Sequence, residues 1–260
     1  MKMLRPFLYR LYERKLFGEI REHLLPRHIG LILHGDRRSA RRLGLIGAVQ
    51  GYKRGSAKLE EVLEWCADLG IGMVTVWILS TENLMRRPEE LGELLSLIER
   101  KLRDAAVDPK IHKRQVRIRA IGKLDLLPES LRDTIRVAEE ATANYEKFFL
   151  NVAVGYGGRQ EVVDAIHGLL TDWGRQGLSL TDIADRVTAE AIGKYLYTYD
   201  LPDPDLIIRT SSEARLSGFL LWQSAYSEYY FCDAYWPAFR KIDLLRAIRS
   251  YQQRHRRFGR

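Results

Sequence analysis

The sequence predicts an α/β fold: a single domain with a mostly parallel, six-stranded sheet flanked by helices. Short apolar runs rich in β-branched residues alternate with segments of helical periodicity along the chain. This alternation is typical of strands that are buried on both faces and connected by helices. No Gly/Ser-rich linker or low-complexity tract interrupts the 260 residues. We therefore assign residues 1–260 to one domain.

The first predicted element is an amphipathic N-terminal helix within residues 1–25. Its apolar residues recur near helical spacing among basic ones: Phe7, Leu8, Leu11, Phe17, Ile20 and Leu24. Pro26 ends the helix, because proline cannot continue the helical hydrogen bonding. A basic amphipathic helix can lie on a membrane surface, but such a helix more often packs on its own domain. We favour packing and keep peripheral membrane contact as the alternative.

The remaining elements alternate between the two periodicities. Continuous apolar runs predict strands over residues 29–33, 73–79, 116–121, 150–154, 206–208 and 229–231. Apolar residues three or four positions apart predict helices over residues 53–69, 88–106, 130–145, 159–175, 189–196 and 241–254.

Composition limits the classes of partner. Lys and Arg outnumber Asp and Glu by 42 to 34, a formal charge of +8 that attracts anions. The basic end at 254–257 comes without a helix-turn-helix or an aromatic-lined groove, so we expect no nucleic-acid binding. Cys66 and Cys232 have neither metal-site nor disulfide spacing. With no secretion signal and no long apolar run, these thiols predict a cytoplasmic protein, with membrane-peripheral contact as a possibility.

Polar residues follow four of the predicted strands. They are His34–Arg38, Ser80–Asn83, Gly155–Arg159 and Arg209–Glu213. Ligands of open α/β sheets bind outside the carboxyl ends of the strands, so these loops are expected to meet at one edge. Gly155–Gly158 matches neither the dinucleotide nor the P-loop fingerprint, and a structural turn explains it as well as phosphate contact.

The residue types in and near these loops suit a phosphorylated ligand. Forked guanidinium donors match phosphate oxygens, and four arginines supply them: Arg38, Arg86, Arg209 and Arg215. Ser217 adds a hydroxyl donor, and Glu228 offers a carboxylate to a divalent cation. The set predicts a metal–diphosphate site.

Long motifs in this chain resemble the cis-prenyltransferases, the undecaprenyl diphosphate synthase family. They are HIGLIL, LGIGMVTVWILSTENLMR, NVAVGYGGRQEVVDA and PDPDLIIRTSSEARLSGFLLWQSAYSEYYF. The chain looks most like the short-chain actinobacterial branch that makes Z-configured farnesyl diphosphate. The resemblance implies a homodimer with a diphosphate site and an apolar tunnel in each subunit. It also implies magnesium-dependent joining of isopentenyl diphosphate to an allylic diphosphate.

The resemblance also implies roles for individual residues. Positions matching Arg209, Arg215 and Ser217 hold isopentenyl diphosphate in the family. The position of Glu228 contributes to magnesium binding, and those of Asn83 and Arg86 support the reacting centre. The C-terminal Arg257-Phe258-Gly259 resembles a tail that reaches the neighbouring subunit's site, which makes Arg257 and Gly259 candidates for substrate binding.

The first loop departs from the family pattern Asp-Gly-Asn-x-Arg-Trp-Ala. Here it reads His34, Gly35, Asp36, Arg37, Arg38, Ser39 and Ala40. Arg38 keeps its expected diphosphate contact, and Gly35, Arg37 and Ser39 are further substrate-binding candidates. His34 replaces the magnesium-binding Asp, although magnesium prefers oxygen ligands.

Three interpretations of this loop remain open. A protonated His34 could donate to a diphosphate oxygen. Asp36, two residues along an extended chain, could supply the displaced metal ligand. His34 could also be inert. We take His34, Asp36, Arg38 and Asn83 as candidate catalytic residues, and Asp36 with Glu228 as candidate magnesium ligands.

Chain length is predicted from one strand residue. Ile78 stands where long-chain members of the family tend to carry a small residue. A bulky side chain there should block the tunnel and restrict the bound chain to about ten to fifteen carbons. Ser39, in place of Trp, opens space and removes an apolar wall where the family positions substrate.

The function expected from these residues is short-chain prenyl transfer. Two alternatives stay open. In one, a repurposed enzyme ionises a single prenyl diphosphate, and the resulting cation cyclises. In the other, a non-catalytic subunit pairs with an active paralogue in a heterodimer.

Overall fold

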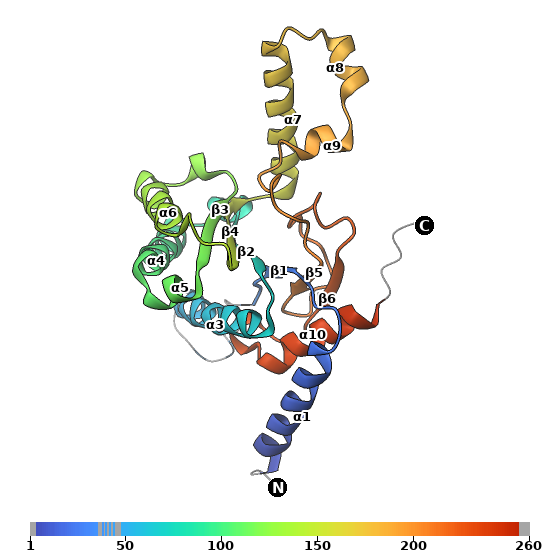
Figure 1. Cartoon of the computed structure of the whole chain (residues 1–260). Helices are drawn as coiled ribbons and strands as arrows, with labels where there is room; N and C mark the ends of the chain where they lie inside the picture. The colour runs from blue at the N-terminus through green and yellow to red at the C-terminus, as the bar shows by residue number, and fades with distance from the viewer. Residues whose placement is uncertain are drawn as a thin grey trace.

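Six parallel strands form one sheet in the order β3-β4-β2-β1-β5-β6 (Figure 1). The computed structural model describes residues 4–35, 38, 40, 42, 44 and 48–254. The strands are β1 His28–Ile32, β2 Met73–Ser80, β3 Val116–Ile121, β4 Phe148–Tyr156, β5 Leu206–Arg209 and β6 Glu228–Phe231. Each overlaps a strand that the sequence predicts, so the predicted fold class is confirmed.

The large hydrophobic core lies on one face of this sheet. Ile29 and Leu31 of β1 point into it, while Ile32 points to the opposite face, as the two-residue period of a strand requires. Many of the other core side chains come from α3 Ala48–Leu69, α4 Pro88–Val107, α6 Glu129–Thr142 and α10 Lys241–Gln253. The apolar side chains that recur at helical spacing in these helices are the ones buried against the sheet.

The opposite face carries a smaller cluster. Its members are Ile32, Ile121, Ala153, Tyr156, Ile207, Phe219 and Leu220. Gly30 permits this packing, since a Cβ there would lie 2.4 Å from Ile207 Cδ1 and 3.1 Å from Phe219 Cε1. The segment after β5 therefore sits close against the sheet, beside the carboxyl ends of β1 and β5.

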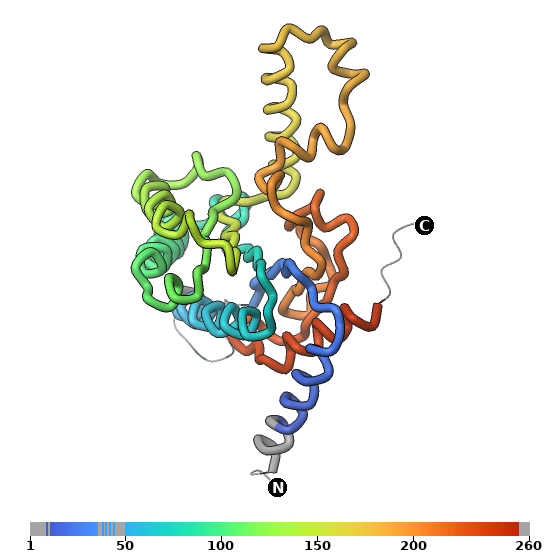
Figure 2. The backbone as a smooth tube through the Cα atoms, in the orientation of Figure 1, coloured from blue at the N-terminus to red at the C-terminus, as the bar shows by residue number. Residues whose placement is uncertain are grey.

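An arm of three helices projects from the sheet. It consists of α7 Gly158–Arg175, α8 Leu180–Arg186 and α9 Ala189–Gly193. The chain leaves through α7 and returns after α9 beside the base of α7 (Figure 2). Fully buried Glu161 fastens this base: it accepts hydrogen bonds from Gln223 Nε2 at 3.0 Å, Tyr197 N at 3.0 Å and the Tyr156 hydroxyl.

Helix α1 Leu4–Arg21 packs on α10 at the other end of the molecule (Figure 1). Leu16 and Ile20 are fully buried, and Gln252 Nε2 donates to Ile20 O at 2.9 Å. Packing on the domain is the interpretation favoured from the sequence. No helix in the described part of the chain is long and apolar enough to span a membrane.

The structure adds short elements that periodicity does not reveal. They are α5 Pro109–Arg114, α8, and the 3-10 turns η1 Glu82–Met85, η2 Leu124–Leu126 and η3 Trp236–Ala238. Local capping holds both helices: Asp108 accepts from Lys110 N at 2.8 Å, and Ser179 forms a capping box with Asp182. Helix α9 ends at Gly193, before the predicted end of that helix.

Candidate diphosphate site

The candidate site begins where β1 and β5 end. Ile32 and Arg209 are paired in the strand register, so the loops that follow them start side by side. Thr210 joins the two loops: its Oγ1 accepts a hydrogen bond from His34 N at 2.9 Å and lies 2.9 Å from His34 O. His34 O also accepts from Trp236 N at 3.0 Å. The backbone at His34 is thereby fixed by elements distant in sequence.

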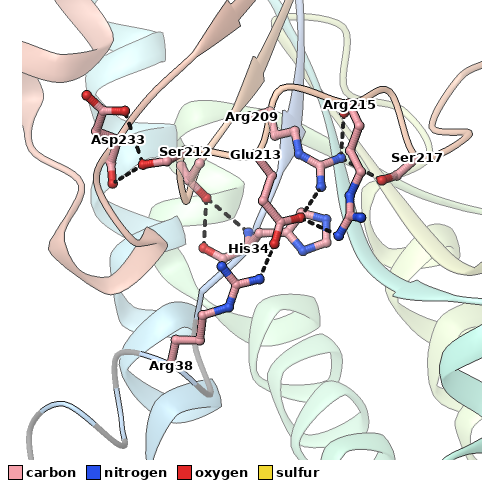
Figure 3. A network of polar contacts seen from close by, with 9 residues as sticks. His34, Arg38, Arg209, Ser212, Glu213, Arg215, Ser217 and Asp233 are labelled. Atoms are coloured by element: carbon pink, nitrogen blue, oxygen red, sulfur yellow. Dashed lines mark hydrogen bonds and ion pairs between the residues drawn. The ribbon is translucent and has the colours of Figure 1, made fainter.

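Three arginines gather around one carboxylate at this edge (Figure 3). We call Arg38, Arg209 and Arg215 the guanidinium cluster. Glu213 accepts from Arg209 Nη2 at 2.8 Å and from Arg215 Nη2 at 2.7 Å, and its other oxygen contacts Arg38 Nη2. The hydrogen bond from Arg38, followed by those from Arg215 and Arg209, lowers the pKa of Glu213 to about 2. One carboxylate against three guanidinium groups leaves the cluster with positive charge.

Arg209 is the buried member of the cluster. Its side chain is 1% exposed, and its Nη1 donates to Arg215 O and Ser217 Oγ, each at 2.7 Å. Ser211, Ser212 and Ser217 adopt positive φ, which turns the loop back over Arg209. The Nε of Arg209 is buried without a hydrogen-bond partner. Burial lowers the pKa of Arg209, but guanidinium retains its charge throughout the working range of proteins. This loop holds a charged fork at a fixed place.

His34 is a neutral imidazole in this setting. Burial, with the positive charge of Arg209 next in size, lowers its pKa from 6.5 to about 4. Its ring meets Trp77 edge-on, with 6.5 Å between the centroids. The imidazole is therefore uncharged near neutral pH before an anion binds, and the interpretation in which a protonated His34 donates to a bound diphosphate stays a prediction. The same arginines that favour an anionic ligand disfavour the imidazolium.

A cavity of about 590 Å³ opens from this edge into the core. At its upper end it is bounded by His34, Ser80, Arg86, Arg215 and Ser217. Apolar side chains of β2, β3, β4, α3 and α4 line its body: Leu59, Leu63, Trp77, Ile78, Leu94, Leu97, Ile98, Leu102, Ile118, Leu150 and Val152. The cavity lies in the size range of small-molecule sites. It pairs a cationic mouth with an apolar body.

Ile78 belongs to the wall of this cavity and does not close it. Leu150 and Ile118 line the cavity and are paired in the strand register, at the level of Val74 on β2. Val74 precedes Ile78 by four residues, which corresponds to roughly 13 Å along a strand. The expectation that Ile78 blocks the tunnel is therefore wrong, because the space continues well past it.

Arg86 and Asn83 lie at the cavity mouth, as predicted. Both line the cavity. Arg86 Nη1 donates to Tyr52 Oη at 2.6 Å and lies 3.3 Å from Glu90 Oε1. Asn83 N donates to Ser80 Oγ at 3.2 Å. Arg86 lies between η1 and α4 and so reaches the cavity from a different segment than the guanidinium cluster.

Glu228 does not join this group. It is the first residue of β6 and is paired with Leu206, whereas the last residue of β6 is paired with Arg209. Its carboxylate accepts from Arg254 Nη1 at 2.6 Å. The convergence predicted for Glu228 is therefore not found within one chain: it lies at the amino end of its strand, and the cluster lies at the carboxyl end.

Several candidate residues fall outside the described part of the chain: Asp36, Arg37, Ser39, Arg257 and Gly259. Gly35 is described, with φ of 104° and its Cα against Tyr235, where a Cβ would lie 2.6 Å from the ring. Only glycine fits this turn, which brings the chain from β1 towards Arg38.

Glu213 is the site residue that the sequence-based selection omitted. Its position four residues after Arg209 and two before Arg215 was the available signal. Charged residues at this spacing in a tight loop can meet, although only the fold shows that they do.

Magnesium is implied by the family, and the described donors alone do not form a site for it. No group of three His, Cys, Asp or Glu side chains gathers within residues 4–35, 38, 40, 42, 44 and 48–254. Glu213, the carboxylate that the guanidinium cluster surrounds, already pairs with all three of its arginines. Any magnesium here would need ligands beyond these residues.

Comparisons with known proteins agree with this geometry. Residues 32–259 match the model of the undecaprenyl diphosphate synthase family. An isoprenyl transferase of Deinococcus radiodurans is 54% identical, over 95% of this chain and 90% of that protein. A (2Z,6E)-farnesyl diphosphate synthase of Thermobifida fusca is 49% identical over the full length of both chains.

A solved structure shows the same fold. The lavandulyl diphosphate synthase of Lavandula x intermedia, in complex with dimethylallyl diphosphate, superposes with a TM-score of 0.84 at 32% identity. The match covers 91% of this chain and 99% of that one. Fold, motifs and overall identity lead to one conclusion. The chain belongs to the undecaprenyl diphosphate synthase family, the cis-prenyltransferases.

Proposed function

We propose that this protein condenses isopentenyl diphosphate with a short allylic diphosphate and so lengthens a prenyl chain. The observation that carries the proposal is the guanidinium cluster, whose member Arg215 lines the mouth of an apolar cavity of about 590 Å³ together with Ser217 and Arg86. Forked cations bind the diphosphate oxygens, and the apolar walls bury the hydrocarbon. The relatives named above include a (2Z,6E)-farnesyl diphosphate synthase, which makes a short product.

The two diphosphates have separate places in this proposal. Arg209, Arg215 and Ser217 hold isopentenyl diphosphate in this proposal. Both Nη atoms of Arg209 already donate within the protein, so the diphosphate takes the place of the Glu213 carboxylate between Arg209 and Arg215. Arg38, on the loop after β1, and Arg86, on the other side of the mouth, contact the allylic diphosphate. Asn83 lies beside Arg86 and orients the reacting groups.

The reaction exchanges one carbon–oxygen bond for one carbon–carbon bond. The allylic C–O bond breaks, and both electrons leave with the diphosphate. The isopentenyl double bond then attacks the allylic carbon, and loss of a proton from the isopentenyl unit restores a double bond. Preorganised guanidinium groups stabilise the departing diphosphate, and this stabilisation is the main way in which the protein lowers the activation barrier. The apolar walls of the cavity shield the cation from water.

Magnesium completes the proposed allylic site. Magnesium usually binds one or two carboxylates together with phosphate oxygens of the substrate. Asp36 is the carboxylate we assign to it in this chain. When bound, the ion would neutralise charge on the leaving diphosphate.

We further propose a cytoplasmic homodimer. Val163, Ile166 and Leu170 form an exposed apolar stripe along α7, at helical spacing. A second copy would cover this stripe and could contribute Arg257 and Gly259 to the site. Cys66 and Cys232 are unpaired and buried, which agrees with a reducing compartment. Any membrane contact would be peripheral and made through α1.

Product analysis tests this function. The purified protein is incubated with dimethylallyl, geranyl or farnesyl diphosphate, each with and without isopentenyl diphosphate and magnesium. We expect a product one or more isoprene units longer that requires both substrates. Consumption of geranyl diphosphate alone would favour the cyclising alternative. No turnover without a co-purified paralogue would favour the heterodimer.

A further inference from the structure

The lower end of the cavity reaches the protein surface between two helices. Beyond Leu102 and Ile111, its lining changes from apolar to charged, with Glu60 of α3 and Lys101, Asp104 and Asp108 at or just after α4. The side chains of Glu60 and Lys101 are 64% and 41% exposed. These residues define a second mouth, on the side away from the guanidinium cluster.

An ion pair spans this second mouth. Lys101 Nζ donates to Glu60 Oε1 at 2.8 Å and so joins α4 to α3. Two more pairs continue along the same face of α3 at four-residue steps: Lys110–Glu64 at 3.4 Å and Arg114–Asp68 at 3.9 Å. Lys101 and Glu60 line the cavity, whereas the four residues of the other two pairs do not.

The walls of the cavity differ in how firmly they are held. Strands β2, β3 and β4 form one wall, in which parallel hydrogen bonds and buried side chains fix every position. The solvent edge of the seam between α3 and α4 is closed by the exposed Lys101–Glu60 pair, and the Lys110–Glu64 and Arg114–Asp68 pairs join α3 to α5 beside it. Such pairs are individually weak. A growing chain that outgrows the cavity meets this seam as its least costly exit.

We propose that the Lys101–Glu60 ion pair closes the second mouth and thereby limits the length of the prenyl product. This inference rests on the proposed chain elongation. It places the length limit at the seam between α3 and α4, because Ile78 leaves the cavity open. Two charged groups at the mouth also disfavour the exit of an apolar tail, since its passage would strip water from them.

Charge reversal and charge exchange test this proposal. Products formed from geranyl diphosphate with excess isopentenyl diphosphate are separated by length for wild type, Glu60→Lys, Lys101→Glu and the double exchange. Each single variant places like charges across the mouth. We expect the fraction of product longer than the main wild-type product to rise by about two- to fivefold, in line with the strength of an exposed pair. The double exchange restores the attraction and should return the wild-type distribution.

Glu64→Lys is the matched control. It reverses the next charge on the same face of α3 and breaks a comparable exposed pair, but it lies outside the cavity lining. We expect it to leave the product distribution unchanged. Unchanged products in both single variants, equal changes in Glu64→Lys, or failure of the exchange to restore the wild-type pattern would overturn the proposal.

A binding measurement keeps this test separate from the proposed function. If wild type incorporates no isopentenyl diphosphate, chain elongation itself fails, and the second mouth is then tested by calorimetry. The affinity of geranylgeranyl diphosphate is compared with that of geranyl diphosphate in the same four proteins. Both single variants should favour the longer ligand by about two- to fivefold over wild type. An unchanged ratio would refute the second mouth.

Discussion

At His34, one side chain decides how the allylic half of the site can work. The imidazole stands where the family carries a carboxylate, and burial beside Arg209 keeps it neutral. A neutral imidazole brings neither a hard oxygen ligand nor a positive charge. Charge in this half of the site then comes from Arg38 and Arg86, and the carboxylate assigned to magnesium is Asp36.

Replacing His34 with aspartate should therefore increase magnesium-dependent elongation. The new carboxylate would be ionised, since nearby guanidinium groups favour the charged form. It would also supply an oxygen ligand to magnesium. We expect the rate of isopentenyl diphosphate incorporation at saturating magnesium to rise by about tenfold, which corresponds to ~1.4 kcal/mol in the barrier.

His34→Asn is the control for this substitution, because it has similar volume to aspartate without the charge. It should show no gain. An equal gain in both variants would assign the effect to space and not to charge. No gain in His34→Asp, even with Asp36→Asn added, would show that the rest of the site has diverged from magnesium-assisted ionisation.

Stability should fall in mild acid because of a second histidine, His28. Its Nε2 lies 2.7 Å from Thr75 Oγ1, and its Nδ1 lies 2.7 Å from Pro202 O. Burial lowers its pKa below 6.5, so the unfolded chain binds a proton that the folded chain excludes. The free energy of unfolding therefore decreases as the pH falls below about 6.5. His34, whose pKa is about 4, acts in the same direction.

Urea unfolding of wild type and His28→Gln at about pH 7.5 and about pH 5 measures this contribution. The variant should be less stable at the higher pH, yet it should lose less stability than wild type on acidification. The same loss in both proteins would contradict the assignment to His28.

The sequence predicts some site residues well and others not at all. Arg209 and Arg215 follow directly from the end of a buried strand, and parallel strands bring such ends together. Glu213 was overlooked because a carboxylate among arginines resembles an ordinary surface ion pair. Glu228 was expected at the same edge, but its place at the start of β6 puts it at the opposite end of the strand. Whether a residue next to a strand reaches the site therefore depends on which end of the strand it occupies.

At the scale of elements, the base of α7 depends on one buried carboxylate. Glu161 joins α7 to β4 through Tyr156, to the segment after α9 through Tyr197, and to the loop after β5 through Gln223. Burial raises its pKa, and the three donors favour the charged form. The same loop carries Ser217 and Phe219, so Glu161 positions part of the diphosphate site without touching it.

Glu161→Ala should destabilise the protein by about 2–4 kcal/mol, because it leaves three buried donors without an acceptor. Glu161→Gln should cost less, since its amide oxygen still accepts. Chemical denaturation measures both. Glu140→Ala, which removes an exposed i,i+4 pair with Arg136 on α6, should change stability by less than about 0.5 kcal/mol. If Glu161→Ala destabilised the protein no more than Glu140→Ala does, the proposed role of the Glu161 network would be contradicted.

The strands and helices that bury many apolar side chains are the ones that the sequence predicts. All six strands and the long helices carry periodic apolar residues that the core requires. Helices α5 and α8 are six and seven residues long, too short for periodicity, and local caps hold them. The cavity could not be read from the pattern, because the same apolar residues would fill a solid core equally well.

At the scale of the whole molecule, we propose that the arm of α7 to α9 forms the interface of the homodimer. Val163 is 58% exposed and Ile166 is 39% exposed on the stripe along α7. The double variant Val163→Glu/Ile166→Glu should shift the protein from dimer to monomer, because it places charge in the apolar centre of an interface. Analytical ultracentrifugation measures the oligomeric state of wild type and variant.

Val137→Glu on α6 is the control, since Val137 is comparably exposed, at 49%, but lies away from the arm. It should leave the dimer intact. A dimer that survives the double substitution on α7 would place the interface elsewhere. A wild-type monomer would remove the proposed contribution of Arg257 and Gly259 to a neighbouring site.

The central claim is that the guanidinium cluster binds diphosphate at the mouth of the cavity. Calorimetric titration of isopentenyl thiolodiphosphate, which resists cleavage, into wild type and Arg209→Lys tests it most directly. Lysine keeps the charge but loses the fork, so affinity should fall by about ten- to a hundredfold while Arg136→Lys, an exposed control, binds as wild type does. Equal affinity in Arg209→Lys and wild type, with both proteins folded, would contradict the account.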